Sequence, residues 1–153
     1  MGAQDIASNK KLVHVELNTF LPSTGPPFDH TTFSPLGHFL FIPSLLGLPG
    51  DAARLWSGLL SPANQTCQMR FFSHMHGHGL GNLTVYIKNK ADDTETALLT
   101  VNGIDVMDVN KWKRHVVELV NPMDFYVIIE ATVGVPGDSD IAVDDITFTP
   151  ECK

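Results

Sequence analysis

Basic residues are scarce in this sequence, and long apolar runs are missing altogether. Lys and Arg number 10 against 17 Asp and Glu, which gives a formal net charge of −7. Nucleic acids and anionic membrane surfaces attract proteins through basic patches, so this charge balance argues against both kinds of partner. No apolar stretch approaches the roughly 20 residues of a membrane-spanning helix, so we expect no direct membrane insertion by this chain.

Recognisable catalytic motifs are also missing. The sequence contains no G-x-S-x-G nucleophile elbow, no H-E-x-x-H zinc motif and no glycine-rich phosphate-binding loop. Each of these motifs fixes a nucleophile, a metal ion or a phosphate in a defined local geometry. We therefore expect no enzyme activity, although Ser, His and Asp are numerous enough that a triad dispersed along the sequence stays open.

Cysteine is limited to two residues, Cys67 and Cys152. By themselves they do not distinguish a disulfide from two buried thiols, because a free cysteine packs as a small apolar residue. Asn64 and Asn82 each begin an N-x-Thr glycosylation signal, although two matches in a chain of this length can also arise by chance. Residues 1–10 lack the apolar segment of a secretory signal, so an extracellular location implies a domain excised from a larger protein.

The residues that are plentiful indicate strands and turns. Twelve Gly and 10 Pro are spread along the chain, which predicts many turns and few long helices. Between them, short segments alternate apolar and polar residues with the period of a strand. We find no linker, so the pattern predicts one all-β domain over residues 1–153, with the strand spacing of a sandwich or a barrel. The expected strands are 12–17, 37–42, 53–60, 67–71, 82–88, 97–101, 112–120, 125–133 and 140–148.

The last expected strand changes its alternation part-way. Ile141 and Val143 share one parity, whereas Ile146 and Phe148 have the other. A period-two strand can keep all four on one face only if a residue is inserted, so the pattern predicts a β-bulge at Asp144-Asp145.

Seven spaced blocks stand out in the sequence: GPPFDHTT (25–32), GHFLFI (37–42), the A-x-L…SP segment (53–62), CQMRFFSHMHG (67–77), KW (111–112), FYVIIE (125–130) and IAVDDI (141–146), with Cys152 as the final cysteine. Together and in this order they resemble the MAM domain, an extracellular module named after meprin, the A5 antigen neuropilin and receptor tyrosine phosphatase mu. The resemblance covers about residues 20–152. Residues 1–19 lack the cysteine pair and tryptophans with which the family opens, so this part has diverged or been truncated.

The resemblance implies a fold, a location and a function. It implies a jelly-roll sandwich with a Cys67–Cys152 disulfide, located outside the cell or at its surface. It also implies protein–protein interaction, as adhesion or oligomerisation of a larger membrane-anchored or secreted protein, with a homophilic or homodimeric partner as one option. The alternative is a carbohydrate-binding jelly-roll module. Its sugar-stacking candidates are few, because aromatic residues make up only 8% of the chain: Trp56, Trp112, Tyr86 and Tyr126.

Three carboxylates are candidate ligands for a structural Ca²⁺, for which the resemblance provides a precedent. Hard oxygen clusters suit this ion, and Asp29, Asp144 and Asp145 would supply them. In the alternative interpretation, Asp29 caps its own turn and Asp144 accepts backbone N–H groups at the bulge. We expect Asp138 and Asp140 to lie in a solvated loop.

His74, His76 and His78 form a second candidate metal motif. Residues spaced by two share one face of a strand, and three imidazoles there would suit Zn²⁺. Gly77 and Gly79 interrupt the strand pattern at this point, however. We therefore expect an exposed hairpin segment, with a zinc site as the alternative.

Overall fold

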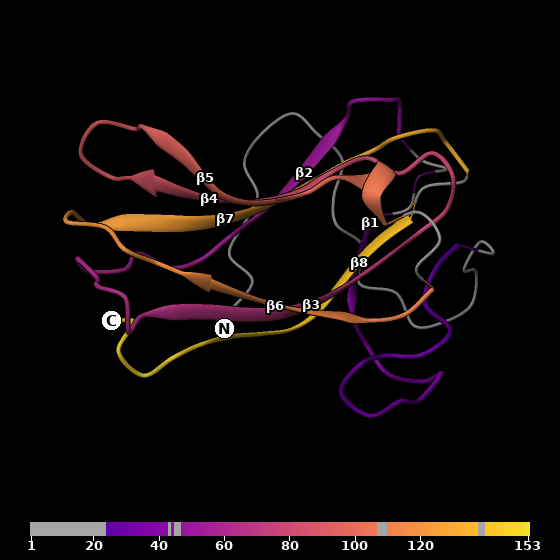
Figure 1. Ribbon diagram of the computed structural model, residues 1–153, viewed down its shortest axis with the longest axis horizontal. Helices are drawn as coiled ribbons and strands as arrows, with labels where there is room; N and C mark the ends of the chain where they lie inside the picture. The colour runs from indigo at the N-terminus through magenta and orange to yellow at the C-terminus, as the bar shows by residue number, and fades with distance from the viewer. Residues whose placement is uncertain (1–23, 43, 45–46, 107–109, 138–139) are drawn as a thin grey trace.

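In the part of the chain that the structure describes, eight strands form two antiparallel four-stranded sheets, which lie face to face as two layers (Figure 1). A computed structural model describes residues 24–42, 44, 47–106, 110–137 and 140–153. Sheet A has the strand order β1-β8-β3-β6, and sheet B has the order β2-β7-β4-β5. The strands are β1 (Leu40–Ile42), β2 (Ala52–Trp56), β3 (Gln68–His76), β4 (Leu83–Asn89), β5 (Glu95–Val101), β6 (Lys113–Glu118), β7 (Phe125–Thr132) and β8 (Asp140–Phe148).

The hydrophobic core lies between the two sheets. Alternate residues of each inner strand point into it, as the period-two patterns predict. Phe71, Leu119 and Phe125 are completely buried. The rest of the buried core comes from both layers: Cys67, Met69, Met75, Leu83, Val85, Ile87, Val117, Val127, Ile129, Ala131, Ile141 and Val143. The expected all-β antiparallel β-sandwich is therefore confirmed.

Most expected strands appear with small shifts in their ends, and the last has the predicted bounds. The segment 12–17 lies outside the described residues. The main error concerns β3, which we expected to end near Phe71 and which continues to His76. It continues because Ser73 to His76 pair with Val143 to Asp140 of β8, which satisfies their backbone groups. Gly77, with a φ of 132°, follows directly after the strand.

The predicted β-bulge is present in β8, displaced by one residue. Arg70 pairs with Thr147 and Phe72 with Asp144, so two residues of β8 lie opposite Phe71 alone. One of these two, Asp145, has a left-handed φ of 52°. The inserted residue explains the change of parity, since it brings both halves of the strand to the core: Ile141 and Val143 before it, Ile146 and Phe148 after it.

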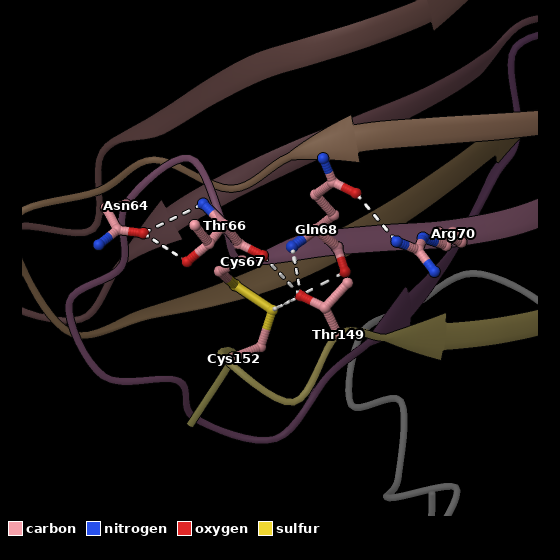
Figure 2. The surroundings of a disulfide bond; sticks show 7 residues. All are labelled: Asn64, Thr66, Cys67, Gln68, Arg70, Thr149 and Cys152. Carbon is pink, nitrogen blue, oxygen red and sulfur yellow. Dashed lines mark hydrogen bonds between the residues drawn. A yellow bond between two sulfur atoms is a disulfide. The ribbon is translucent and has the colours of Figure 1, made fainter.

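A disulfide joins the chain just before β3 to the segment after β8 (Figure 2). Cys67 and Cys152 are 85 residues apart in sequence and 4.7 Å apart between Cα atoms. Thr149 supports this junction, because its hydroxyl donates to the Thr66 carbonyl at 2.8 Å and accepts from the Gln68 N–H at 3.0 Å. The pairing implied by the resemblance is confirmed, and the alternative of two free thiols is wrong.

Candidate functional site

Residues 24–39, which we call the loop segment, lie against the outer face of sheet A. The His30 ring stacks on Phe72 of β3, with ring centroids 3.5 Å apart and planes 19° apart. Trp112 lies beside the segment, and its indole N–H donates to the Phe28 carbonyl at 3.0 Å. Phe39 contacts Trp112 at 5.8 Å between ring centroids and belongs to a second, smaller apolar cluster. The loop segment therefore covers part of a sheet face that would otherwise meet solvent.

The bulge of β8 holds the loop segment through Asp145. Its carboxylate lies 2.6 Å from His30 Nδ1 and accepts a hydrogen bond from the Thr31 hydroxyl at 2.5 Å. The Thr31 hydrogen bond, followed by His30, lowers the pKa of Asp145 below its usual value. These contacts fix the exposed side of the loop segment to a strand more than 100 residues later in the sequence.

Asp29 organises the turn at the centre of the loop segment. Its carboxylate is only 2% exposed and accepts hydrogen bonds from the Thr32 N–H, the Thr32 hydroxyl and the Ser34 N–H, at 2.7–2.9 Å. Burial raises the pKa of Asp29, but these hydrogen bonds outweigh burial and lower it. A Cβ at Gly37 would lie 2.1 Å from the Asp29 carboxyl group, so the glycine leaves room for this cap.

The three candidate Ca²⁺ ligands are close in the fold but act as hydrogen-bond acceptors. Asp144 accepts from the backbone N–H groups of His30 and Asp145, both at 2.8 Å. Asp29 and Asp145 accept hydrogen bonds from donors of the loop segment. The alternative interpretation expected this role for Asp29. Their oxygen chemistry suits Ca²⁺. Among the described residues, no group of three His, Cys, Asp or Glu side chains is placed to hold a metal ion, so the Ca²⁺ site stays a prediction.

The histidine motif is divided by the fold. His74 is 1% exposed on the outer face of sheet A, and its Nε2 lies 2.9 Å from the Asn110 side-chain oxygen. The Nδ1 atoms of His74 and His76 are buried without a hydrogen-bond partner. Burial is the main cause of the lowered pKa of His74. The expected exposed hairpin is therefore wrong for His74, while His78 is exposed beyond the end of β3.

Asp140 also departs from expectation. It is 1% exposed, not part of a solvated loop. Its carboxylate accepts from the Thr24 hydroxyl at 2.6 Å and from both the N–H and the hydroxyl of Ser44 at 3.0 Å. These donors replace water around the buried charge. Asp138 lies outside the described residues.

A Ser–His pair inside the sandwich was missed at the level of sequence. The Ser73 hydroxyl lies 2.7 Å from His115 Nε2, and the His115 ring stacks on Phe71 at 4.8 Å between centroids. Burial lowers the pKa of His115 to about 4. Both side chains are more than 90% buried, so a substrate cannot reach them. The parity of His115, shared with Val117, was the signal that it faces inward.

Arg54 forms two ion pairs on the outer face of sheet B. Its guanidinium donates to Glu130 at 2.6 Å and to Glu95 at 3.0 Å, partners that the sequence did not identify. The same group lies over the Tyr86 ring, 5.5 Å from its centroid. Cations thus cover aromatic surface on this face.

The aromatic residues proposed as sugar platforms offer little open ring surface. Trp56 meets Tyr126 edge-on at 5.8 Å between centroids, and the Lys88 ammonium lies over Trp56 at 5.9 Å. Trp56, Tyr86, Tyr126 and Trp112 are all only partly exposed. A solvent-exposed tryptophan beside a metal site would have favoured a carbohydrate module, and neither tryptophan meets that description.

Both predicted glycosylation asparagines are on the surface. Asn64 and Asn82 are exposed, the first in the turn before β3 and the second just before β4. The Asn64 side-chain oxygen accepts from the N–H and hydroxyl of Thr66 (Figure 2). The Asn82 side-chain oxygen accepts from the Gly103 N–H at 3.2 Å.

The family model described as "MAM domain, meprin/A5/mu" matches residues 4–153. The chain belongs to the MAM domain family. Human MAM domain-containing protein 2 is 36% identical over 125 residues, which cover 82% of this chain and 18% of that protein. Neuropilin-1 of Xenopus laevis is 36% identical over 125 residues, or 80% of this MAM domain and 13% of that protein.

Two solved structures have the same kind of fold. The K1 cleaved adhesin domain of Lys-gingipain from Porphyromonas gingivalis has a TM-score of 0.55 and 14% identity, with 73% of each chain covered. The K3 domain has a TM-score of 0.53 and 17% identity, with 83% and 81% covered. At such identities only the fold is shared. This MAM domain spans less than a fifth of the curated relatives named above. In its described part, no helix is long and apolar enough to cross a membrane.

Proposed function

We propose that this MAM domain is an extracellular protein–protein interaction module that mediates adhesion or oligomerisation of a larger membrane-anchored or secreted protein. One observation carries the proposal beyond family membership: exposed apolar side chains lie on sheet A and its loop segment. Phe33 is 64% exposed and Leu36 is 74% exposed, while Val116 and Val120 of the β6 region are 43% and 53% exposed. Exposed apolar side chains mark a surface that contacts another protein where they form a contiguous patch, and we expect these residues to belong to such a patch.

The backbone at Phe33 supports a binding role for the loop segment. Phe33 has a φ of 54°, in the left-handed region that side chains with a Cβ seldom adopt. Its ring nevertheless stays mostly in solvent. It makes tilted ring contacts with Phe28 and His30 of the same segment. Strained positions that the surrounding structure maintains are concentrated at functional surfaces.

An extracellular location fits the covalent chemistry of the domain. The Cys67–Cys152 disulfide would persist outside the cell, where thiols are not kept reduced. Asn64 and Asn82 are accessible to carry glycans, which would keep a tight interface away from their surroundings. We propose no catalytic role, and a Ca²⁺ ion at Asp29, Asp144 and Asp145 stays a prediction.

Cell binding by a multimeric form of the domain tests this function. The domain would be tetramerised through a tag and applied to cells, with a reduced and alkylated sample as the control for folding. We expect staining that protease treatment of the cells removes and glycosidase treatment leaves. Loss of staining after glycosidase alone would favour the carbohydrate-binding alternative. No staining combined with no self-association would contradict the proposed function.

A further inference from the structure

β6 is an edge strand whose pairing with β3 is regular throughout. Lys113 to Glu118 pair with Ser73 to Gln68 without a shift in register. In the described part of the chain, β6 has no strand on its other side. A regular, exposed strand edge is a template for pairing with another chain, and proteins usually interrupt such edges. The edge of β5, for example, is interrupted by a bulge at Leu98.

The backbone groups of three β6 residues point to this free edge. The Leu119 N–H donates to the Cys67 carbonyl at 2.9 Å, so Leu119 is oriented toward β3. Backbone direction alternates along a strand, and residues of the opposite parity are therefore oriented away from β3. These residues are Arg114, Val116 and Glu118, and each leaves an N–H and a C=O for another strand.

The side chains of the same three residues are all exposed. Arg114 and Glu118 form no ion pair with any other described residue. Within one chain they cannot pair with each other, because four residues of strand separate them by about 13 Å. Two opposite charges thus flank an exposed valine, at equal distances in sequence.

We propose that β6 binds β6 of a second copy of this chain, antiparallel and two-fold symmetric about Val116. This register joins Val116 to itself by two backbone hydrogen bonds and places each Arg114 opposite Glu118 of the other copy. Cross-strand neighbours lie about 5 Å apart, which brings the unpaired charges into contact. The two sheets A become one continuous eight-stranded sheet. The proposal rests on the proposed function and specifies its partner and surface.

The other edges lack this complementarity. β1 has three residues, too few for a stable ladder. Pairing two copies of β2 about its middle residue, Arg54, would bring two guanidinium groups face to face. Like charges opposite each other destabilise a strand pair. Among the described edges, β6 is the one on which symmetric pairing brings unpaired opposite charges together.

Charge exchange tests the proposed register. Sedimentation velocity over a concentration series would compare wild type, Arg114→Glu, Glu118→Arg and an equimolar mixture of the two variants. Lys90→Glu, at an exposed residue of the β4–β5 turn, makes the same charge change as Arg114→Glu away from β6. A third variant, Val116→Pro, removes an N–H that points to the free edge and leaves the β3 ladder intact. Circular dichroism confirms that each variant is folded.

We expect wild type and Lys90→Glu to dimerise, and each charge variant alone to bind itself about tenfold or more weakly, because two favourable pairs become repulsive. The mixture should recover the wild-type affinity, since each Glu then faces an Arg. Val116→Pro should stay monomeric. A monomeric wild type, unchanged affinity in folded variants, or failure of the mixture to dimerise would overturn the proposal. If the tetramer still stains cells in that case, the proposed function survives while the β6 interface does not.

Discussion

Ser73 and His115 form a hydrogen-bonded pair in the interior of the sandwich, 2.7 Å apart between Oγ and Nε2. The pair joins β3 to β6 from the core side, opposite the face that carries the loop segment. His115 stacks on Phe71 and receives no ion pair from the described carboxylates. The imidazole is therefore held in its neutral form, and this has a consequence for stability.

Acid should destabilise the domain through His115. Its pKa is about 4 in the fold, against an ordinary value of 6.5. As pH falls below 6.5, the unfolded chain takes up a proton that the folded chain excludes, so stability decreases until about pH 4. The loss amounts to roughly 3–4 kcal/mol at most, since each pKa unit corresponds to about 1.4 kcal/mol. The lowered pKa of His74 acts in the same direction.

Urea unfolding between pH 7 and pH 4.5 measures this loss. His115→Gln keeps a hydrogen-bonding side chain opposite Ser73 without a titratable group, so its free energy of unfolding should vary less over this range. An equally steep decrease in the variant would show that other groups cause the acid sensitivity.

Alternation along the sequence predicted which way side chains face, and this explains both its successes and its errors. The bounds of β8 and its bulge could be predicted from the sequence because Ile141 and Phe148 must both reach the core. The burial of His74 and Asp140 could not be predicted from the sequence pattern. Both lie on the outer face of sheet A, and that face is covered by residues that are far away in sequence, such as Thr24 and Trp112.

The exchange Gly37→Ala should destabilise the loop segment. An added Cβ would lie 2.1 Å from the Asp29 carboxyl group, which three hydrogen bonds hold in place. Overpacking of this kind costs about 1–3 kcal/mol of unfolding free energy. Gly58→Ala is the matched control, because a Cβ there meets no atom within 4 Å. Thermal unfolding would compare them, and an equal melting temperature would contradict the cap assigned to Asp29.

Replacing both Cys67 and Cys152 with alanine should reduce stability strongly. The disulfide closes a loop of 85 residues, and the chain-entropy relation gives about 4–5 kcal/mol for such a loop. Strain or residual structure in the unfolded chain would lower this value. Urea unfolding of oxidised wild type and of the double variant measures the difference. A loss below about 1 kcal/mol would mean that the hydrogen bonds of Thr149 hold the two ends without the disulfide.

Each sequon should carry one glycan when the domain is secreted from an animal cell. Asn64 and Asn82 are exposed, so a glycan at either is compatible with the fold. Asn64→Gln and Asn82→Gln should each remove one glycan mass, and the double variant should match the enzymatically deglycosylated chain. Mass spectrometry of the intact protein decides this, and an unmodified wild-type chain would show that neither sequon is used.

Ca²⁺ should bind weakly if it binds at the predicted carboxylates. Asp145 and Asp144 already accept hydrogen bonds from His30 and Thr31, so an ion must replace these donors. Extracellular Ca²⁺-binding modules have dissociation constants of about 0.1–1 mM, and we expect an affinity no tighter than this range. Calorimetric titration with Ca²⁺ alone should detect binding that Asp145→Asn weakens about tenfold. Asp105→Asn, at an exposed residue of the 3-10 turn Gly103–Asp105, is the control. Absence of heat in wild type, or equal affinity in Asp145→Asn, would leave these aspartates with the structural role that their hydrogen bonds describe.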